Sequence, residues 1–275
     1  MTDQRFTAIP EQGWEAADEA LIHRALKVVD EALQDPAAVQ YLHRYYDRGG
    51  NYAGATFLNL DPVRPWDITA ADLVALTLLS VDAPPYSVRR LLEPSPDRNL
   101  VLRLLSEDRL PLDADLAMAD ADTLLAMADL HEALKSCLSP AYVKTKNSWV
   151  TASKLCARKR PDLFPVRDSV VCGVLGLGHN YHVDWQVFRC IIQDDGVRNR
   201  LDALVDAAAA RGADIGHPNR RLRHLDALLW MRAARPHIVA SGIPELSTRL
   251  DDDSKGVSGR MRGGIGVRVG RCSRQ

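Results

Sequence analysis

The sequence predicts an all-α protein, a single globular domain of about ten helices over residues 1–250 followed by a disordered tail. Apolar residues recur at helical spacing along most of the chain, and Ser, Thr and Asp stand where helix N-caps belong. No segment sustains the alternation that is typical of a half-buried β-strand. With 275 residues, of which 46% are hydrophobic, the chain has ample material for a core.

The first helix is expected within residues 14–34. Its apolar stripe consists of Leu21, Ile22, Ala25, Val29 and Leu33. Asp35 and Pro36 end this helix and start a second one, because Asp is a favoured N-cap and Pro fits the first helical position. Residues 48–68 lack a sustained period and predict a long loop, with at most a short strand at 51–57.

A variant of the capping box, formed by Thr69 and Asp72, precedes a helix that Pro84 and Pro85 end. The next helices are expected over 99–107, 119–137, 149–160, 181–193, 197–211 and 221–234. Asp168 follows a turn and stands where an N-cap belongs.

The distribution of charge along the chain says more about ligand binding than the net charge of −1. Residues 107–132 hold eight acidic residues and one Arg, a net of −7, whereas residues 144–168 carry a net of +5. Fields of opposite sign can steer a charged ligand to one face. The alternative is that both segments form solvated faces that keep the protein soluble.

The composition also bears on compartment and cofactors. No run of 18 apolar residues occurs, the first residues lack the order of a secretory signal, and the five Cys include no C-x-x-C pair. We therefore expect a cytoplasmic protein with reduced thiols, no contact with membranes, no metal and no cofactor. Cys172, His179, His182 and Cys190 lie close in sequence but lack the tighter pairs of structural zinc sites.

The end of the chain, residues 251–275, contains six Gly and five Arg and no periodicity. Such a composition buries too little apolar surface to offset the entropy of ordering, so a disordered tail is expected. Similar Arg/Gly segments contact nucleic acid, which is the alternative interpretation.

Residues 149–171 combine a helix, a tight apolar turn and an Asp that starts the next helix. This segment resembles the catalytic segment of the helix-hairpin-helix DNA glycosylases, the group that includes endonuclease III. Thr151-Ala152 and the stretch from Pro165 to Asp168 occupy similar positions at similar spacing. The resemblance implies a glycosylase-like helical architecture, DNA as the partner and Asp168 as the catalytic residue. Asp168 would stabilise positive charge on the sugar, or activate water, as the base departs.

The resemblance also implies which residues would contact nucleic acid and which would form a base pocket. The cations that would contact nucleic acid are Lys144, Lys146, Lys154, Arg158, Lys159, Arg160 and Arg167. The aromatic residues that would form a base pocket are Trp149, Phe164 and Tyr181. The purely structural alternatives are an Asp168 that only caps a helix, a solvated basic helix end and aromatic residues of the core.

The segment departs from the glycosylase pattern in two respects. The glycosylase hairpin has a Gly-containing turn that binds phosphate, and residues 142–148 contain no Gly. The lysine of the members that also act as lyases falls near Val150. Lys154 lies one helical turn later, about 6 Å along the axis.

Most of residues 45–235 resembles an uncharacterised bacterial family of unknown function. The matching pieces are Asn51–Gly54 with Phe57, Thr69–Ala75, Arg160–Pro165 and Leu225–Met231. This resemblance implies a shared fold, and the family has no established activity that could be transferred to the chain. On the glycosylase resemblance of residues 149–171, the leading hypothesis is a DNA-binding protein of glycosylase-like fold that excises a modified base. The alternative is a catalytically silent helical module whose basic patch docks an acidic partner.

Overall fold

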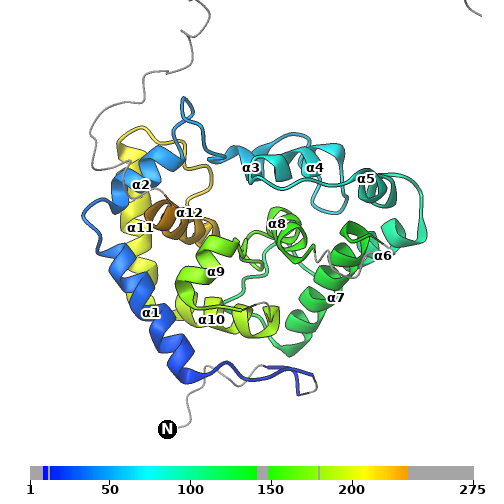
Figure 1. The fold of residues 1–275 in the computed structure, drawn as a ribbon, viewed down its shortest axis with the longest axis horizontal. Coiled ribbons are helices and arrows are strands. Elements are labelled where there is room, and N and C mark those ends of the chain that lie inside the picture. The colour runs from blue at the N-terminus through cyan, green and yellow to red at the C-terminus, as the bar shows by residue number, and fades with distance from the viewer. Residues whose placement is uncertain (1–8, 12, 141–147, 179, 235–275) are drawn as a thin grey trace, which may run out of the picture. The chain divides into compact units, whose positions relative to one another are not determined.

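The computed structural model describes residues 9–11, 13–140, 148–178 and 180–234. This part of the chain forms twelve α-helices and no strand, which confirms the all-α prediction (Figure 1). The helices are α1 (Glu19–Leu33), α2 (Ala38–Tyr45), α3 (Thr56–Asn59), α4 (Ala70–Thr77), α5 (Pro85–Leu92), α6 (Pro96–Leu104), α7 (Ala121–Leu138), α8 (Trp149–Lys159), α9 (Ser169–Leu175), α10 (Tyr181–Gln193), α11 (Asp195–Ala210) and α12 (Arg221–Ala234). None of these helices is long and apolar enough to cross a membrane. The predicted tail, residues 251–275, lies outside the described residues.

Local sequence signals account for many helix ends. α10 and α12 occupy the predicted ranges. The capping box at the start of α4 is present, since the Thr69 amide donates to Asp72 Oδ2 over 2.8 Å and Thr69 Oγ1 accepts from the Asp72 amide over 3.4 Å. Asp168 caps α9 as predicted, and its Oδ1 accepts from the Val170 amide over 3.0 Å.

The structure differs from the predictions near Pro and Gly residues in three places. Residues 51–57 form no strand, which agrees with the prediction of at most a short one, but α3 interrupts the predicted loop. α4 ends at Thr77, before the Pro pair that is expected to end it. The pair instead starts α5, because Pro85 occupies a first-turn position that needs no amide donor. α2 begins at Ala38, two residues later than expected, because Asp35 accepts from the Ala37 amide in a turn that precedes the helix.

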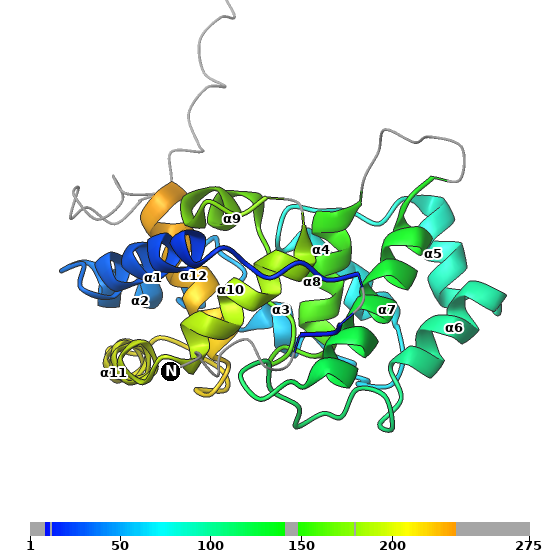
Figure 2. The ribbon, with the colours of Figure 1, turned by 90° about the horizontal axis from the view of Figure 1, so that it is seen from below.

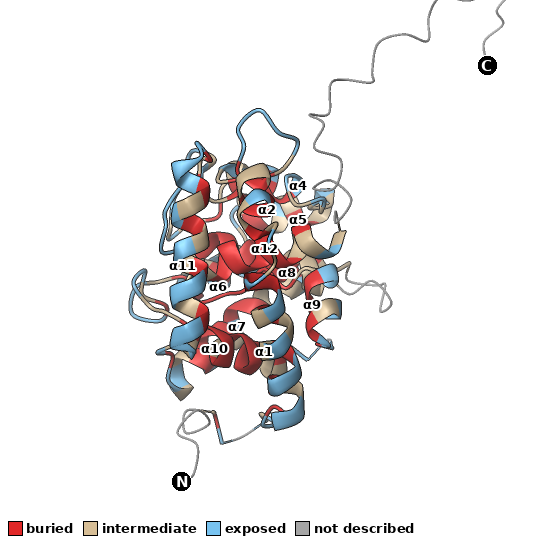
Figure 3. Ribbon diagram, turned by 90° about the vertical axis from the view of Figure 1, so that its left-hand side faces the viewer, coloured by how far each residue is buried: buried red, intermediate tan, exposed pale blue. Residues whose placement is uncertain are grey.

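α12 lies at the centre of one group of helices. It packs against α1, α2, α9 and α11, and every residue from 222 to 229 is buried. In Figure 3, α12 is buried over most of its length, while α1 and α11 expose their outer sides. A helix that is buried almost all round loses the clear amphipathic stripe of a surface helix.

A second group consists of α4 to α8, in which α7 packs against α6 and α8, and α8 also packs against α4. α10 packs against α1, α11 and α12 and so belongs to the first group. Side chains connect the two groups, since His131 of α7 contacts the Trp185 ring of α10 at a centroid distance of 5.8 Å. The segment before α1 runs along α10 (Figure 2), where the Ala17 amide donates to Gln186 Oε1 over 2.8 Å. Residues from both groups surround the two cavities described below.

Candidate functional site

Lys154 and Asp168 meet beside a cavity. Lys154 lies in the middle of α8, and its Nζ donates to Asp168 Oδ2 over 3.0 Å and to the Leu79 carbonyl over 2.8 Å. The Lys154 side chain is buried, whereas 18% of the Asp168 side chain remains exposed. Because the Val170 amide holds the other carboxylate oxygen, the position of Asp168 is fixed by α8 and α9 together.

The cavity has a volume of about 440 Å³, which falls within the range of small-molecule sites, roughly 300–1,000 Å³. Its wall is formed by the 51–53 loop, the 78–81 turn, α8, the start of α9 and α12. Tyr45, Tyr52 and Trp230 supply the aromatic part of the wall. The Tyr52 ring meets the Trp230 ring edge-on at 5.9 Å and stacks on Tyr45 at the same distance.

Two backbone positions near the cavity are strained. Ser80, which lines the cavity, has φ 59°, and Arg167, which precedes Asp168, has φ 53°. They are the only non-Gly residues with positive φ in the described part of the chain. Such strain persists where surrounding contacts impose it, and it concentrates at functional sites. At Arg167 the contacts are buried bonds from its guanidinium to Asp184, one of them 2.9 Å from Nε to Oδ2.

A second carboxylate reaches the same cavity from α12. Asp226 Oδ2 accepts from Arg223 over 2.6 Å, whereas its Oδ1 is buried without a hydrogen-bond partner among the described residues. Burial raises the pKa of Asp226 to about 6, against the opposing effect of Arg223, and the charge of Asp168 adds to the rise. Asp226 can therefore exchange a proton near neutral pH and offers an unused acceptor.

The raised pKa predicts a specific pH dependence of stability. Because folded Asp226 holds its proton more tightly than the unfolded chain does, its contribution is present below pH 3.8 and is lost as the pH rises to about 6. The Asp226→Asn variant lacks this titration. We expect the wild-type free energy of unfolding, minus that of the variant, to fall across this window and to stay flat above it. Urea unfolding at a series of pH values measures the difference, and a rise or no change would contradict the assignment.

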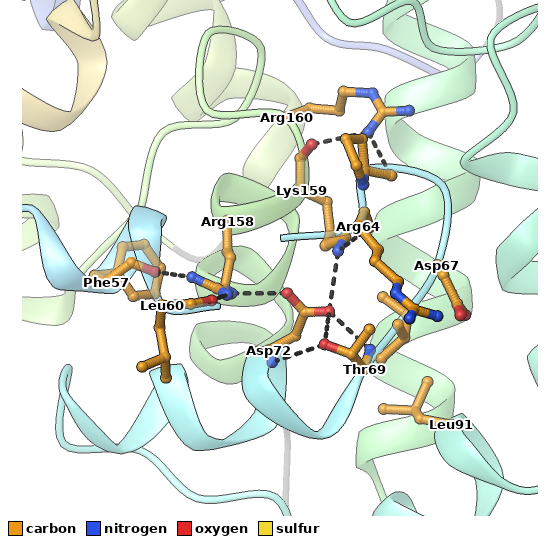
Figure 4. Close-up of polar contacts among 12 residues, drawn as sticks. Phe57, Leu60, Arg64, Asp67, Thr69, Asp72, Leu91, Arg158, Lys159 and Arg160 are labelled. Carbon is orange, nitrogen blue, oxygen red and sulfur yellow. Dashed lines mark hydrogen bonds and ion pairs between the residues drawn. The ribbon is translucent and has the colours of Figure 1, made fainter. Parts of the chain in front are cut away.

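The five described cations of the predicted DNA-binding face are buried rather than exposed: Lys154, Arg158, Lys159, Arg160 and Arg167. Figure 4 shows Asp72 bound by Arg158 and Lys159, with distances of 2.7 Å to Arg158 Nε and 3.0 Å to Lys159 Nζ. Arg160 donates to backbone carbonyls, including that of Leu110 over 2.8 Å. The prediction of an exposed basic face by these five residues was wrong, because internal acceptors from distant segments enclose them.

The other predicted site residues have different environments. Phe164 is a core residue, 1% exposed, with its ring 5.5 Å from that of Trp185. Trp149 is half-buried, and the guanidinium of Arg167 lies 4.8 Å from its ring centroid. Tyr181 packs on His131 at 4.5 Å. None of the three is among the residues that line the Asp168 cavity, so they form no base pocket there. Lys144 and Lys146 lie outside the described residues.

Sequence reasoning missed the residues that accompany Asp168. Asp226 is the one acidic residue in the otherwise apolar run from Leu225 to Met231. A lone carboxylate in such a run is the signal that could have indicated a buried functional residue. Asn51 and Tyr52 belong to residues 48–68, for which the sequence predicts a loop with at most a short strand. No group of three or more His, Cys, Asp or Glu side chains with metal-binding geometry occurs among the described residues.

Comparison with known proteins gives the family of the chain. A model described as a family of unknown function (DUF6308) matches residues 38–233, which include α2 to α11 and nearly all of α12. No curated protein and no solved structure matches the chain. The matched range contains the cavity together with Lys154, Asp168 and Asp226. The chain therefore belongs to DUF6308, a family of unknown function.

Proposed function

We propose that the Asp168 cavity receives a nucleotide turned out of DNA and that the protein hydrolyses the bond between its base and its sugar. One observation carries the proposal: a carboxylate held by a buried lysine and a second carboxylate with an unused oxygen line the same cavity. Pairs of carboxylates in different environments are typical of glycosidic hydrolysis. The resemblance of residues 149–171 to the glycosylase segment supports DNA as the substrate.

The two carboxylates suit different steps. Asp168, fixed by Val170 and Lys154, would stabilise the positive charge that forms on the sugar as the carbon–nitrogen bond breaks. Asp226, with its pKa raised to about 6 by burial, would give its proton to the departing base. Water then adds to the sugar carbon, and its proton returns to Asp226. The products are the free base and an abasic sugar.

The cavity wall also fits an unstacked base. Tyr52 and Trp230 offer ring faces and edges of the kind on which extruded bases stack. Contacts to phosphates remain a prediction for Lys144 and Lys146, which precede α8. The alternative of a module that docks an acidic partner depended on an exposed basic patch, and the five described cations of that patch are buried. We therefore do not propose that alternative.

The test compares binding of the full chain to plain duplex DNA and to a duplex carrying an abasic-site analogue, over a series of salt concentrations. We expect tighter binding to the analogue by about tenfold or more, equivalent to about 1.4 kcal/mol, because the analogue mimics the extruded sugar. Duplexes with modified bases are then screened for released base. Equal binding with a steep salt dependence would indicate a nonspecific electrostatic binder. Absence of binding at low salt would remove the DNA hypothesis.

A further inference from the structure

A second cavity, about 300 Å³ in volume, lies against the cluster around Asp72. Its wall includes Gly54 and Ala55, the end of α8, the 215–217 segment and the first turn of α12. Of the residues that line the Asp168 cavity, only Arg223 also lines this one. The second cavity is therefore a separate site, and what it binds does not depend on the proposed base excision.

The wall of this cavity carries an excess of positive charge. Four cations line it, Arg158, Lys159, Arg220 and Arg223, together with a single carboxylate, Asp72. Arg220 and Arg223 also pair with Asp162 and Asp226, neither of which lines the cavity. Burial lowers the pKa of both Lys159 and Arg220. The four cations pair with three carboxylates, Asp72, Asp162 and Asp226, so positive charge is in excess, and an anion in the cavity would stabilise the charged forms of Lys159 and Arg220.

Hydrogen-bond donors remain available among these cations. Arg223 Nε is buried without an acceptor among the described residues. Lys159 Nζ donates to the Arg64 carbonyl over 2.8 Å and to Asp72 over 3.0 Å, which uses two of its three protons. An unsatisfied buried donor is unfavourable, so a ligand that supplies acceptors would gain binding energy here.

We infer that the second cavity binds a phosphate group carried by a small phosphate ester. Phosphate offers several acceptor oxygens and two negative charges, which suits guanidinium groups presented together with a lysine. His224 lines the cavity as a neutral group, because burial lowers its pKa to about 4, and it is held by the Tyr46 hydroxyl at 2.8 Å. The selectivity for an anion therefore comes from the four cations and not from this histidine.

The test measures stabilisation of the full chain by inorganic phosphate and by a deoxynucleoside monophosphate, against sodium chloride at matched ionic strength. The test variant is Arg220→Gln, since Arg220 lines the cavity and 30% of its side chain is exposed. The matched control is Arg221→Gln, because Arg221 is similarly exposed, lines a different hollow and pairs with Asp202. We expect saturable binding by the wild type, a loss of about tenfold or more in Arg220→Gln and little change in Arg221→Gln.

A second variant keeps the test decisive if Arg220→Gln folds poorly. Ala55→Leu adds apolar volume to the wall without changing a charge, and it should remove phosphate binding while the helical content is retained. Plain duplex DNA at the same phosphate concentration tests whether the bound phosphate comes from a DNA backbone rather than from a small phosphate ester. We expect the duplex to compete only weakly with inorganic phosphate for the cavity. The inference fails if the wild type shows no saturable phosphate effect, if both arginine variants lose binding equally, or if only the duplex binds.

Discussion

Replacing Asp72 with alanine is expected to lower the free energy of unfolding by about 3–5 kcal/mol. Asp72 is 1% exposed and binds Arg158 and Lys159, which are also buried. The substitution leaves both cations without their shared carboxylate in the interior. It also removes the capping box with Thr69 at the start of α4. The loss should therefore exceed that of an ordinary helix cap, which is about 1 kcal/mol.

Urea unfolding followed by circular dichroism measures this loss. Asp113→Ala is the matched control, because it deletes an exposed carboxylate, and its effect should stay within about 0.5 kcal/mol. Asp72→Asn should fall between wild type and Asp72→Ala, since the amide oxygen still accepts hydrogen bonds but carries no charge. If Asp72→Ala is as stable as Asp113→Ala, the cluster in Figure 4 does not carry the energetic role assigned to it.

The Asp168→Asn variant should release base at a rate about 100- to 10,000-fold below that of the wild type. The substitution keeps the shape of the side chain and an oxygen that can cap α9, while the charge that would stabilise the sugar cation is lost. Binding to the abasic-site duplex should change far less, because that binding depends on the cavity wall rather than on this charge.

A close control for Asp168→Asn exists in the same chain. Asp18 caps α1 with nearly the same backbone conformation, φ −61° and ψ 130°, against φ −61° and ψ 141° at Asp168, and it accepts from the amide two residues later in the same way. It does not line the Asp168 cavity. Asp18→Asn should therefore retain full base release. Wild-type rates in Asp168→Asn, measured on whichever substrate the screen identifies, would reduce Asp168 to a helix cap.

Local signals in the sequence were sufficient for much of the fold. The Asp168 cap, the Thr69–Asp72 capping box and the ranges of α10 and α12 depend on residues within a few positions of one another, so the chain alone predicts them. The helix α5 was missed although its signal was local, because a Pro pair indicates the end of a helix and can equally occupy the start of one. α4 ends at Thr77, before this pair.

The candidate site, in contrast, depends on contacts across long stretches of chain. Asp72 is 86 residues from Arg158 in the sequence. This distant carboxylate, together with backbone carbonyls, accepts hydrogen bonds from the basic residues of α8 and allows them to be buried. Asp226 joins Asp168 through the packing of α12 against α9. By itself the sequence determined the all-α class, the capping box of Thr69 and Asp72, and the place of Asp168 at the start of α9. Tertiary structure alone decided which charges are buried and which carboxylates share a cavity, because burial and pairing arise only when distant helices pack together.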